Sequence, residues 1–265
     1  MAKAIGLSRK IKLQWLNKAV DLLGENLTEE EYKAKMNEYL SFEIESPTVL
    51  RKTREILMRV WFYEDDADVA TIRKDALDLI KKYPDYDVAI HWCMLLAVYP
   101  VFVDLSRLMG RIAEFNDVIT LSQLKQKLYD EWGERSTLYH STDKIIATIK
   151  ELGVITSDKP GNYMIVKHAV TRPNVVNFMV RVAMKVDGNS YYSFTDLNAF
   201  NVLYPFEYKV SKEELRSSLA MTTEEIRRAC GVTSETMRPL GPSWGRDTRP
   251  YAGARLAVHS DMAQS

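Results

Sequence analysis

Apolar residues recur every three or four positions through most of the first half of the chain, which is the spacing of amphipathic helices. One apolar stripe covers residues 11–23 and ends at Gly24, a residue that often terminates helices. A second stripe covers residues 28–40, and a third covers residues 49–61. The pattern predicts a mostly α protein, a helical bundle whose first helix is basic.

Two of these stripes carry start signals. Thr28 and Glu31 form a capping box, in which a hydroxyl and a carboxylate satisfy free backbone N–H groups. Ser46 followed by Pro47 predicts the next helix start, because serine accepts an N–H and proline has none to lose. Two capped helices with a short link form a hairpin similar to a helix-turn-helix. We expect Arg51, Lys52, Glu55 and Arg59 on its outward side.

The middle of the chain predicts further helices. The acidic cluster at residues 64–68 suits a helix start, and it lacks the glycine and the twelfth-position glutamate of a calcium loop. The apolar run of residues 88–103 is shorter than the roughly 20 residues that span a bilayer. We therefore expect a buried core helix at about 86–98, a second helix at 101–115, and no membrane partner.

From residue 120 the pattern changes to helix, turn, helix and hairpin. Thr120 or Ser122 can cap a helix that Gly133 ends, and a second helix runs from residue 136 to 152. Two strand-like runs within 154–166 flank a turn of Lys, Pro, Gly and Asn. This order is typical of a winged helix, so the predicted fold includes helix-turn-helix elements and one winged-helix-like β-hairpin.

The second helix of this segment would enter a DNA major groove by its N-terminal half. Ser141, Thr142 and Lys144 in that half could contact phosphates or bases, whereas Asp143 argues against a uniformly basic face. Lys159 and Asn162 at the hairpin tip could reach the DNA backbone. Residues 121–167 hold seven basic and six acidic residues, so the segment is nearly neutral. Winged folds also serve as protein-docking modules, and this alternative stays open.

The last third has weaker patterns. Residues 175–186 fit a helix or a strand, residues 187–190 a turn, and Ser193 can cap a short helix. Capping residues at 211–214 and 222–225 predict two more helices, and the prolines after residue 238 end that pattern. We expect four parts: residues 1–118 (helical domain), 119–170 (winged-helix-like module), 171–239 (helical extension) and 240–265 (flexible tail).

Composition narrows the function classes. Lysine plus arginine and aspartate plus glutamate number 36 each, so general affinity for nucleic acid is weak and a local basic face is needed. Cys93 and Cys230 form no disulfide or zinc pattern, which favours a reducing cytoplasm. No phosphate-loop, dinucleotide, nucleophile-elbow or zincin motif occurs, and the four histidines are scattered. We therefore expect no enzyme, no cofactor and no metal.

Three stretches together resemble the BrxA family of BREX phage-defence systems: SPTVLRKTREIL at 46–57, the apolar helices of 88–115, and HSTDKIIATIKELGVI at 140–155. The resemblance covers roughly residues 20–170. It implies a cytoplasmic, all-helical DNA-binding protein of antiviral defence with helix-turn-helix elements in both halves. The resemblance implies two DNA-contacting faces. Arg51, Lys52 and Arg54 match one of them, and Ser141, Thr142 and Lys144 match the other. Residues 175–265 depart from the family as an addition.

Two hypotheses follow. The first is a non-enzymatic component of a defence complex that contacts duplex DNA through basic helices and the winged segment. Its candidate contact residues are Lys10, Lys12, Arg51, Lys52, Arg54, Ser141, Thr142, Lys144, Lys159 and Asn162. The second is a protein-interaction adaptor that docks a larger defence or regulatory enzyme without touching DNA.

Overall fold

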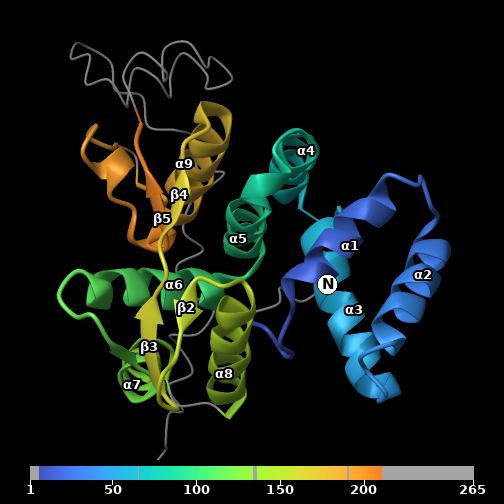
Figure 1. Ribbon diagram of the computed structural model, residues 1–265, viewed down its shortest axis with the longest axis horizontal. Helices are drawn as coiled ribbons and strands as arrows, with labels where there is room; N and C mark the ends of the chain where they lie inside the picture. The colour runs from blue at the N-terminus through green and yellow to red at the C-terminus, as the bar shows by residue number, and fades with distance from the viewer. Residues whose placement is uncertain (1–5, 65, 134–135, 190, 211–265) are drawn as a thin grey trace, which may run out of the picture.

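The computed structural model describes residues 6–64, 66–133, 136–189 and 191–210, and over these ranges the protein is mostly helical, as predicted (Figure 1). The α-helices are α1 (Leu13–Leu23), α2 (Glu29–Ser41), α3 (Pro47–Trp61), α4 (Ala67–Lys82), α5 (Asp87–Val98), α6 (Pro100–Ala113), α7 (Leu121–Trp132), α8 (Ser136–Glu151) and α9 (Pro173–Asp187). The short 3-10 helices are η1 (Pro84–Tyr86), η2 (Asp196–Asn198) and η3 (Asn201–Leu203). The strands are β1 (Ile119–Thr120), β2 (Ile155–Thr156), β3 (Asn162–Ile165), β4 (His168–Val170) and β5 (Phe206–Tyr208).

Helix starts follow the local chemistry of the sequence. Thr28 and Glu31 form the predicted capping box of α2, and Thr120 forms a second one with Gln123 at α7. Asp66 in the acidic cluster accepts hydrogen bonds from two backbone N–H groups at the start of α4. Ser46 differs: it precedes Pro47 at the start of α3 as predicted, but its side chain makes no capping hydrogen bond.

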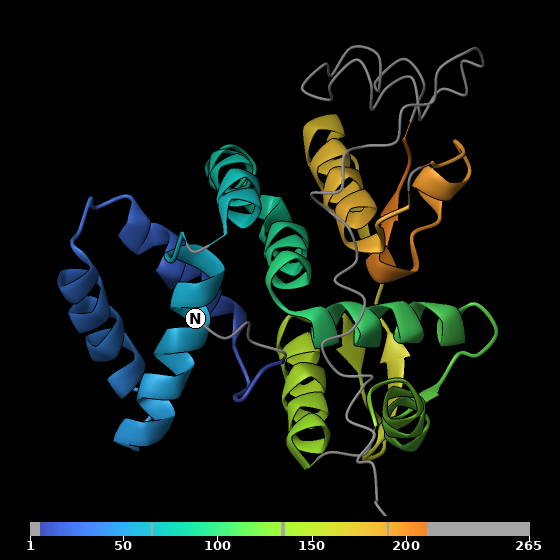
Figure 2. The ribbon, with the colours of Figure 1, turned by 180° about the vertical axis from the view of Figure 1, so that it is seen from behind.

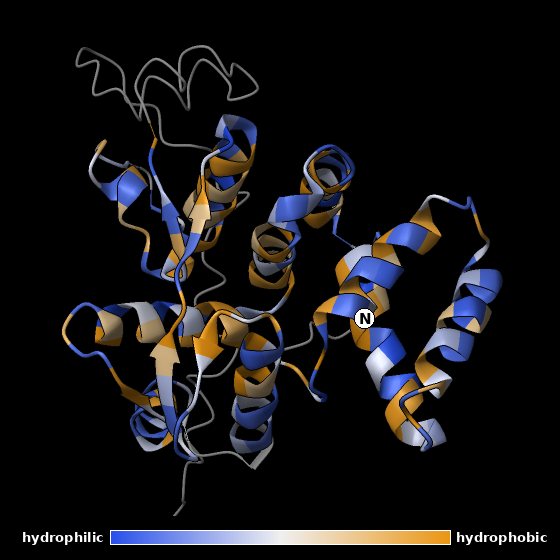
Figure 3. Ribbon diagram, in the orientation of Figure 1, coloured by the Kyte–Doolittle hydropathy of each residue, from blue (hydrophilic) through white to orange (hydrophobic). Residues whose placement is uncertain are grey.

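Helices α1, α2 and α3 pack together at one end of the molecule, each with one apolar side (Figure 3). The prediction of a basic first helix was wrong in one respect, because α1 begins only at Leu13. Lys10 and Lys12 lie before it, in a segment of residues 6–12 that we call the N-terminal segment. Its backbone is extended at Lys12, and Leu7 and Ile11 are fully buried, so core packing holds it in place.

The apolar run of residues 88–103 is split between two helices. The α5 helix is buried on nearly all sides, and Tyr99 separates it from α6, which begins with Pro100. Proline cannot supply the N–H that would continue α5. Within the described ranges, no helix has the length and apolar character needed to cross a membrane.

The segment from α6 to β3 forms a compact unit below α5 in Figure 1. Helices α7 and α8 pack against α6 and each other. The predicted strands β2 and β3 pair antiparallel, with Ile155 opposite Ile165, and β3 also pairs with β1, which gives the order β1-β3-β2. Gly161 in the connecting turn has a φ of 82°, a conformation that favours glycine.

The run at 175–186 is a helix, α9, and it packs against α4 and α5. It connects β4 to β5, which pair in parallel, a pairing that the sequence did not predict. One apolar core extends from Leu7 to Val210. The predicted helices and tail after residue 210 lie outside the described residues, and the domain boundaries stay predictions.

Candidate functional site

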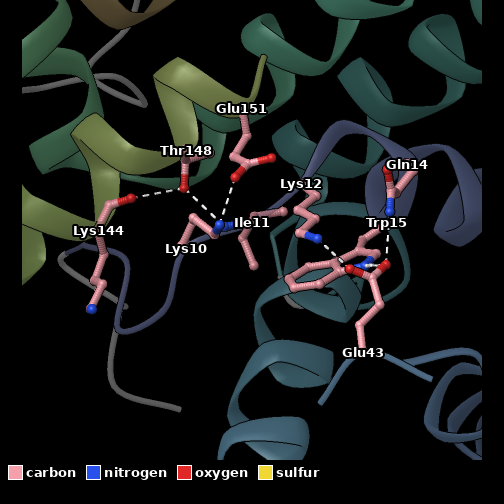
Figure 4. Close-up of polar contacts among 9 residues, drawn as sticks. All are labelled: Lys10, Ile11, Lys12, Gln14, Trp15, Glu43, Lys144, Thr148 and Glu151. Atoms are coloured by element: carbon pink, nitrogen blue, oxygen red, sulfur yellow. Dashed lines mark hydrogen bonds and ion pairs between the residues drawn. The ribbon is translucent and has the colours of Figure 1, made fainter. Parts of the chain in front are cut away.

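The N-terminal segment runs between α3 and α8, and both helices begin at the lower end of the molecule (Figures 1 and 2). Three contacts attach the segment to α8. The backbone N–H of Ile11 donates to Thr148 Oγ1 at 3.0 Å, and Lys10 Nζ lies 2.6 Å from Glu151 Oε1 (Figure 4). A Cβ on Gly6 would lie 2.1 Å from Ser141 Oγ, so only glycine fits there without a shift.

These contacts decide which predicted residues of α8 are available. Ser141 is partly buried, and its Oγ has no hydrogen-bond partner among the described residues. Thr142 is fully buried, and its hydroxyl donates to the Leu138 carbonyl at 2.9 Å. Thr142 therefore cannot reach a ligand and leaves the set of candidate contacts. Lys144 is half-buried, and its side chain points away from Thr148 and Glu151 (Figure 4).

The acidic residue in the first half of α8 is compensated. Lys125 of α7 lies 2.7 Å from Asp143 Oδ1, and its ammonium sits 3.3 Å from the centre of the Tyr139 ring. Burial lowers the pKa of Lys125, but its hydrogen bonds with Asp143 and Tyr139 outweigh this and raise that pKa. Asp143 thus presents little free negative charge to a ligand of α8.

The two lysines of the N-terminal segment are compensated too. Lys10 pairs with Glu151 as described, and Lys12 pairs with Glu43. Gln14 and Trp15 also donate to Glu43 Oε1, at 2.7 and 3.1 Å (Figure 4). The hydrogen bond from Lys12 is the main cause that lowers the pKa of Glu43. Lys10 and Lys12 were predicted to contact DNA, but each first balances an acid of the protein itself.

The cations of α3 are arranged differently. Arg51 and Lys52 are exposed, and within the described part of the chain neither forms an ion pair. Arg59, two turns further along α3, also lacks one there. Arg54, by contrast, lies 2.6 Å from Glu55 and donates to Asn37. Of the predicted cations on α3, Arg51 and Lys52 are thus the uncompensated ones, and Arg54 is not.

Arg51, Lys52 and Arg59 line one pocket with Gly6 and Tyr99. Gly6 also touches Ser141 of α8, so the structure brings the two predicted halves of the site within reach of one segment. Arg59 and Tyr99 were not among the predicted contacts. The spacing of Arg51, Glu55 and Arg59 at four-residue intervals was a signal for Arg59. No local signal marked Tyr99.

The hairpin tip lies apart from this pocket. Lys159 is exposed, and Asn162 is partly buried at the start of β3. The backbone N–H of Asn162 donates to the Lys159 carbonyl at 3.0 Å, and Asn162 pairs with Thr120 in the sheet. The turn therefore holds Lys159 on a rigid support, where its ammonium is open to solvent.

The buried polar side chains of α5, His91 and Cys93, are packed in the protein core. His91 lies 2.6 Å from the Asn17 amide oxygen and meets Trp61 edge-on, and burial lowers its pKa to about 3. Burial also raises the pKa of the Cys93 thiol. Over the described ranges, no group of three or more His, Cys, Asp or Glu residues is placed to hold a metal ion.

The surface of interest is therefore the lower end of the molecule, with α3, α8 and the N-terminal segment between them. Comparison with known proteins adds no identity to this geometry: no family model, no curated protein and no solved structure matches the chain.

Proposed function

We propose that this protein binds duplex DNA without sequence stringency and has no catalytic role. One observation carries the proposal: Arg51 and Lys52 near the start of α3 and Arg59 in its last turn form no ion pair within the described ranges, and they line one pocket with Gly6, which lies against α8. Phosphate neutralisation by such cations supplies most of the affinity in sequence-tolerant binding. The net charge of the whole chain is zero, so a local cluster of this kind is what DNA binding requires.

The unit from α6 to β3 supports the proposal by its order of elements. The unit consists of a helix, a short strand, two helices and a hairpin whose second strand pairs with the first strand, and we interpret this order as that of a winged helix. In this interpretation α8 is the recognition helix and Lys159 lies on the wing. Lys144 and Lys159 would contact phosphates, since Ser141 and Thr142 are turned into the protein.

The resemblance to the BrxA family would place this binding in a phage-defence assembly in the cytoplasm. Within the described residues the three stretches that carry the likeness correspond to α3, to α5 and α6, and to α8 with β2. Two of them contribute to the lower end of the molecule. Other components of a defence complex are then the proposed partners.

The direct test is the triple variant Arg51→Glu, Lys52→Glu, Lys144→Glu in a duplex-binding measurement across a salt series. We expect it to lose at least about tenfold in affinity at about 50 mM salt, because three phosphate contacts become repulsive. The matched control reverses Lys74, Lys81 and Lys82, exposed lysines of α4 at the opposite end. Equal binding by the test variant and the wild type would refute the proposal.

A second function, a protein-docking adaptor, is favoured by a different observation. Phe115 is 84% exposed, and it lines a groove of about 400 Å³ with Leu108 and Ile112 between α6 and α7. An exposed aromatic side chain beside apolar neighbours is typical of protein interfaces. This hypothesis expects no duplex binding at about 50 mM salt. It also expects Phe115→Ser to abolish a stable complex with a neighbouring gene product.

A further inference from the structure

The pocket beside α3 is a half-open hollow as well as a charged surface. It lies between α3, the start of the N-terminal segment and Tyr99 at the junction of α5 and α6. Its volume is about 370 Å³. Pockets that hold small molecules have volumes of about 300–1,000 Å³, so this one has room for a phosphate group and part of the molecule that carries it.

The charge of the pocket selects an anion. Arg51, Lys52 and Arg59 lie on one side of α3 and line the same pocket. Glu55 also lines it, but Arg54 holds one carboxylate oxygen at 2.6 Å and the Tyr63 hydroxyl donates to the other at 2.9 Å. Glu55 is thus already engaged, and three cations remain for a ligand.

Tyr99 provides an independent sign of a missing partner. Its side chain is 1% exposed and lines the pocket, and its hydroxyl has no hydrogen-bond partner among the described residues. Buried hydroxyl groups are nearly always hydrogen-bonded, so an orphan at a pocket wall points to a ligand that would accept. Burial raises the pKa of this hydroxyl, against the effect of Arg59, so it remains a neutral donor.

We propose that this pocket binds a phosphate monoester or diester, held by Arg51, Lys52, Arg59 and the Tyr99 hydroxyl. Guanidinium groups match two phosphate oxygens at once, and the ammonium and the phenol leave no oxygen of the anion without a donor. A carboxylate, with two oxygens, would use fewer of these donors. The proposal stands apart from duplex binding, because it predicts phosphate binding with no DNA present.

The test is calorimetric titration of the full chain with inorganic phosphate, a nucleoside monophosphate and the same nucleoside without phosphate. We expect saturable binding of the first two and none of the third. Arg59→Gln should weaken binding by about tenfold and Tyr99→Phe by about fivefold, because each removes one donor and Phe keeps the buried ring. Lys74→Gln, on α4, is the control and should bind as the wild type does. Thermal melting of each variant reports folding.

A second arm distinguishes the two sources of phosphate. Competition between inorganic phosphate and an unphosphorylated duplex would identify the DNA backbone as the natural occupant. Binding of the monophosphate to the duplex-bound protein would identify a separate small molecule. Either result supports phosphate binding in the pocket. The proposal is overturned if the wild type binds neither phosphate probe, or if Arg59→Gln and Tyr99→Phe both bind phosphate as tightly as Lys74→Gln does.

Discussion

Helices α3 and α8 both begin at the lower end of the molecule, yet they differ in how much of their charge is compensated. On α8 the acids Asp143 and Glu151 are matched by lysines from other elements, and the polar side chains face inward. On α3 one acid is held by its neighbour Arg54, and Arg51 and Lys52 stay uncompensated. The sequence already sets part of the difference, because α3 has four basic residues and one acid whereas α8 has two of each. What packs against each helix decides how much of that charge a ligand meets.

The N-terminal segment adds to this difference, because its Lys10 pairs with Glu151 of α8. It lies along the face of α8 that carries Ser141, Thr148 and Glu151, and uses hydrogen-bonding groups of that face for its own attachment. Beside α3 the same segment leaves a pocket rather than filling it. The segment thus covers part of α8 and lines a pocket beside α3. Its attachment to α8 and the free charge of α3 can be tested separately.

The largest effect is expected from Thr148→Val, which breaks the attachment to α8. Valine keeps the shape but loses the Oγ1 that accepts from the buried Ile11 N–H. An orphaned buried donor costs about 1–3 kcal/mol, so the free energy of unfolding should fall by that amount. Thr148→Ser keeps the hydroxyl and should lose only about 1 kcal/mol for its methyl group. Denaturant unfolding of both variants measures these free energies. If the valine variant is as stable as the wild type, the hydrogen bond from Ile11 to Thr148 does not stabilise the fold.

An intermediate effect is expected when the two helices are neutralised separately. Arg51→Gln with Lys52→Gln should lower the slope of log affinity for duplex DNA against log salt by about 1.8, since each phosphate contact contributes about 0.9. Lys144→Gln with Lys150→Gln, on α8, should lower it by about half as much, because Lys144 is half-buried. Both pairs remove two charges, so they control for each other. A larger loss from the α8 pair would reverse the comparison.

The smallest effect is expected from Glu43→Gln, which releases Lys12 from its partner. The pKa of Glu43 is lowered in the folded protein, so the stability from this pair is present above its ordinary pKa of 4.5 and is lost as pH falls through the folded value. Near neutral pH the variant should lose less than about 1 kcal/mol, as partly exposed pairs do. Melting temperatures between about pH 5 and pH 3 should fall more for the wild type than for the variant.

Glu30→Gln is the matched control for that measurement, because Glu30 is an exposed glutamate of α2. It should follow the wild-type pH profile. If Glu43→Gln follows it too, the pairing with Lys12 contributes nothing to stability in solution.

The sequence by itself determined the local features of this protein. The capping residues Thr28 and Thr120 fixed helix starts, the three-to-four-residue stripes fixed helices through α8, and the turn at Gly161 fixed the hairpin of β2 and β3. It also placed Arg51 and Lys52 on one outward face of α3. These features depend on residues a few positions apart, so their signals are visible in a short window.

Only the tertiary structure decided which of the predicted contacts stay available. Thr142 and Lys144 are two residues apart on α8, and packing buries one and half-exposes the other. The pairing of Lys10 with Glu151 joins residues 141 positions apart, and the pocket of Arg59 and Tyr99 joins α3 and the α5–α6 junction to the N-terminal segment. Charge compensation and pocket formation depend on such distant neighbours, and no local pattern encodes them.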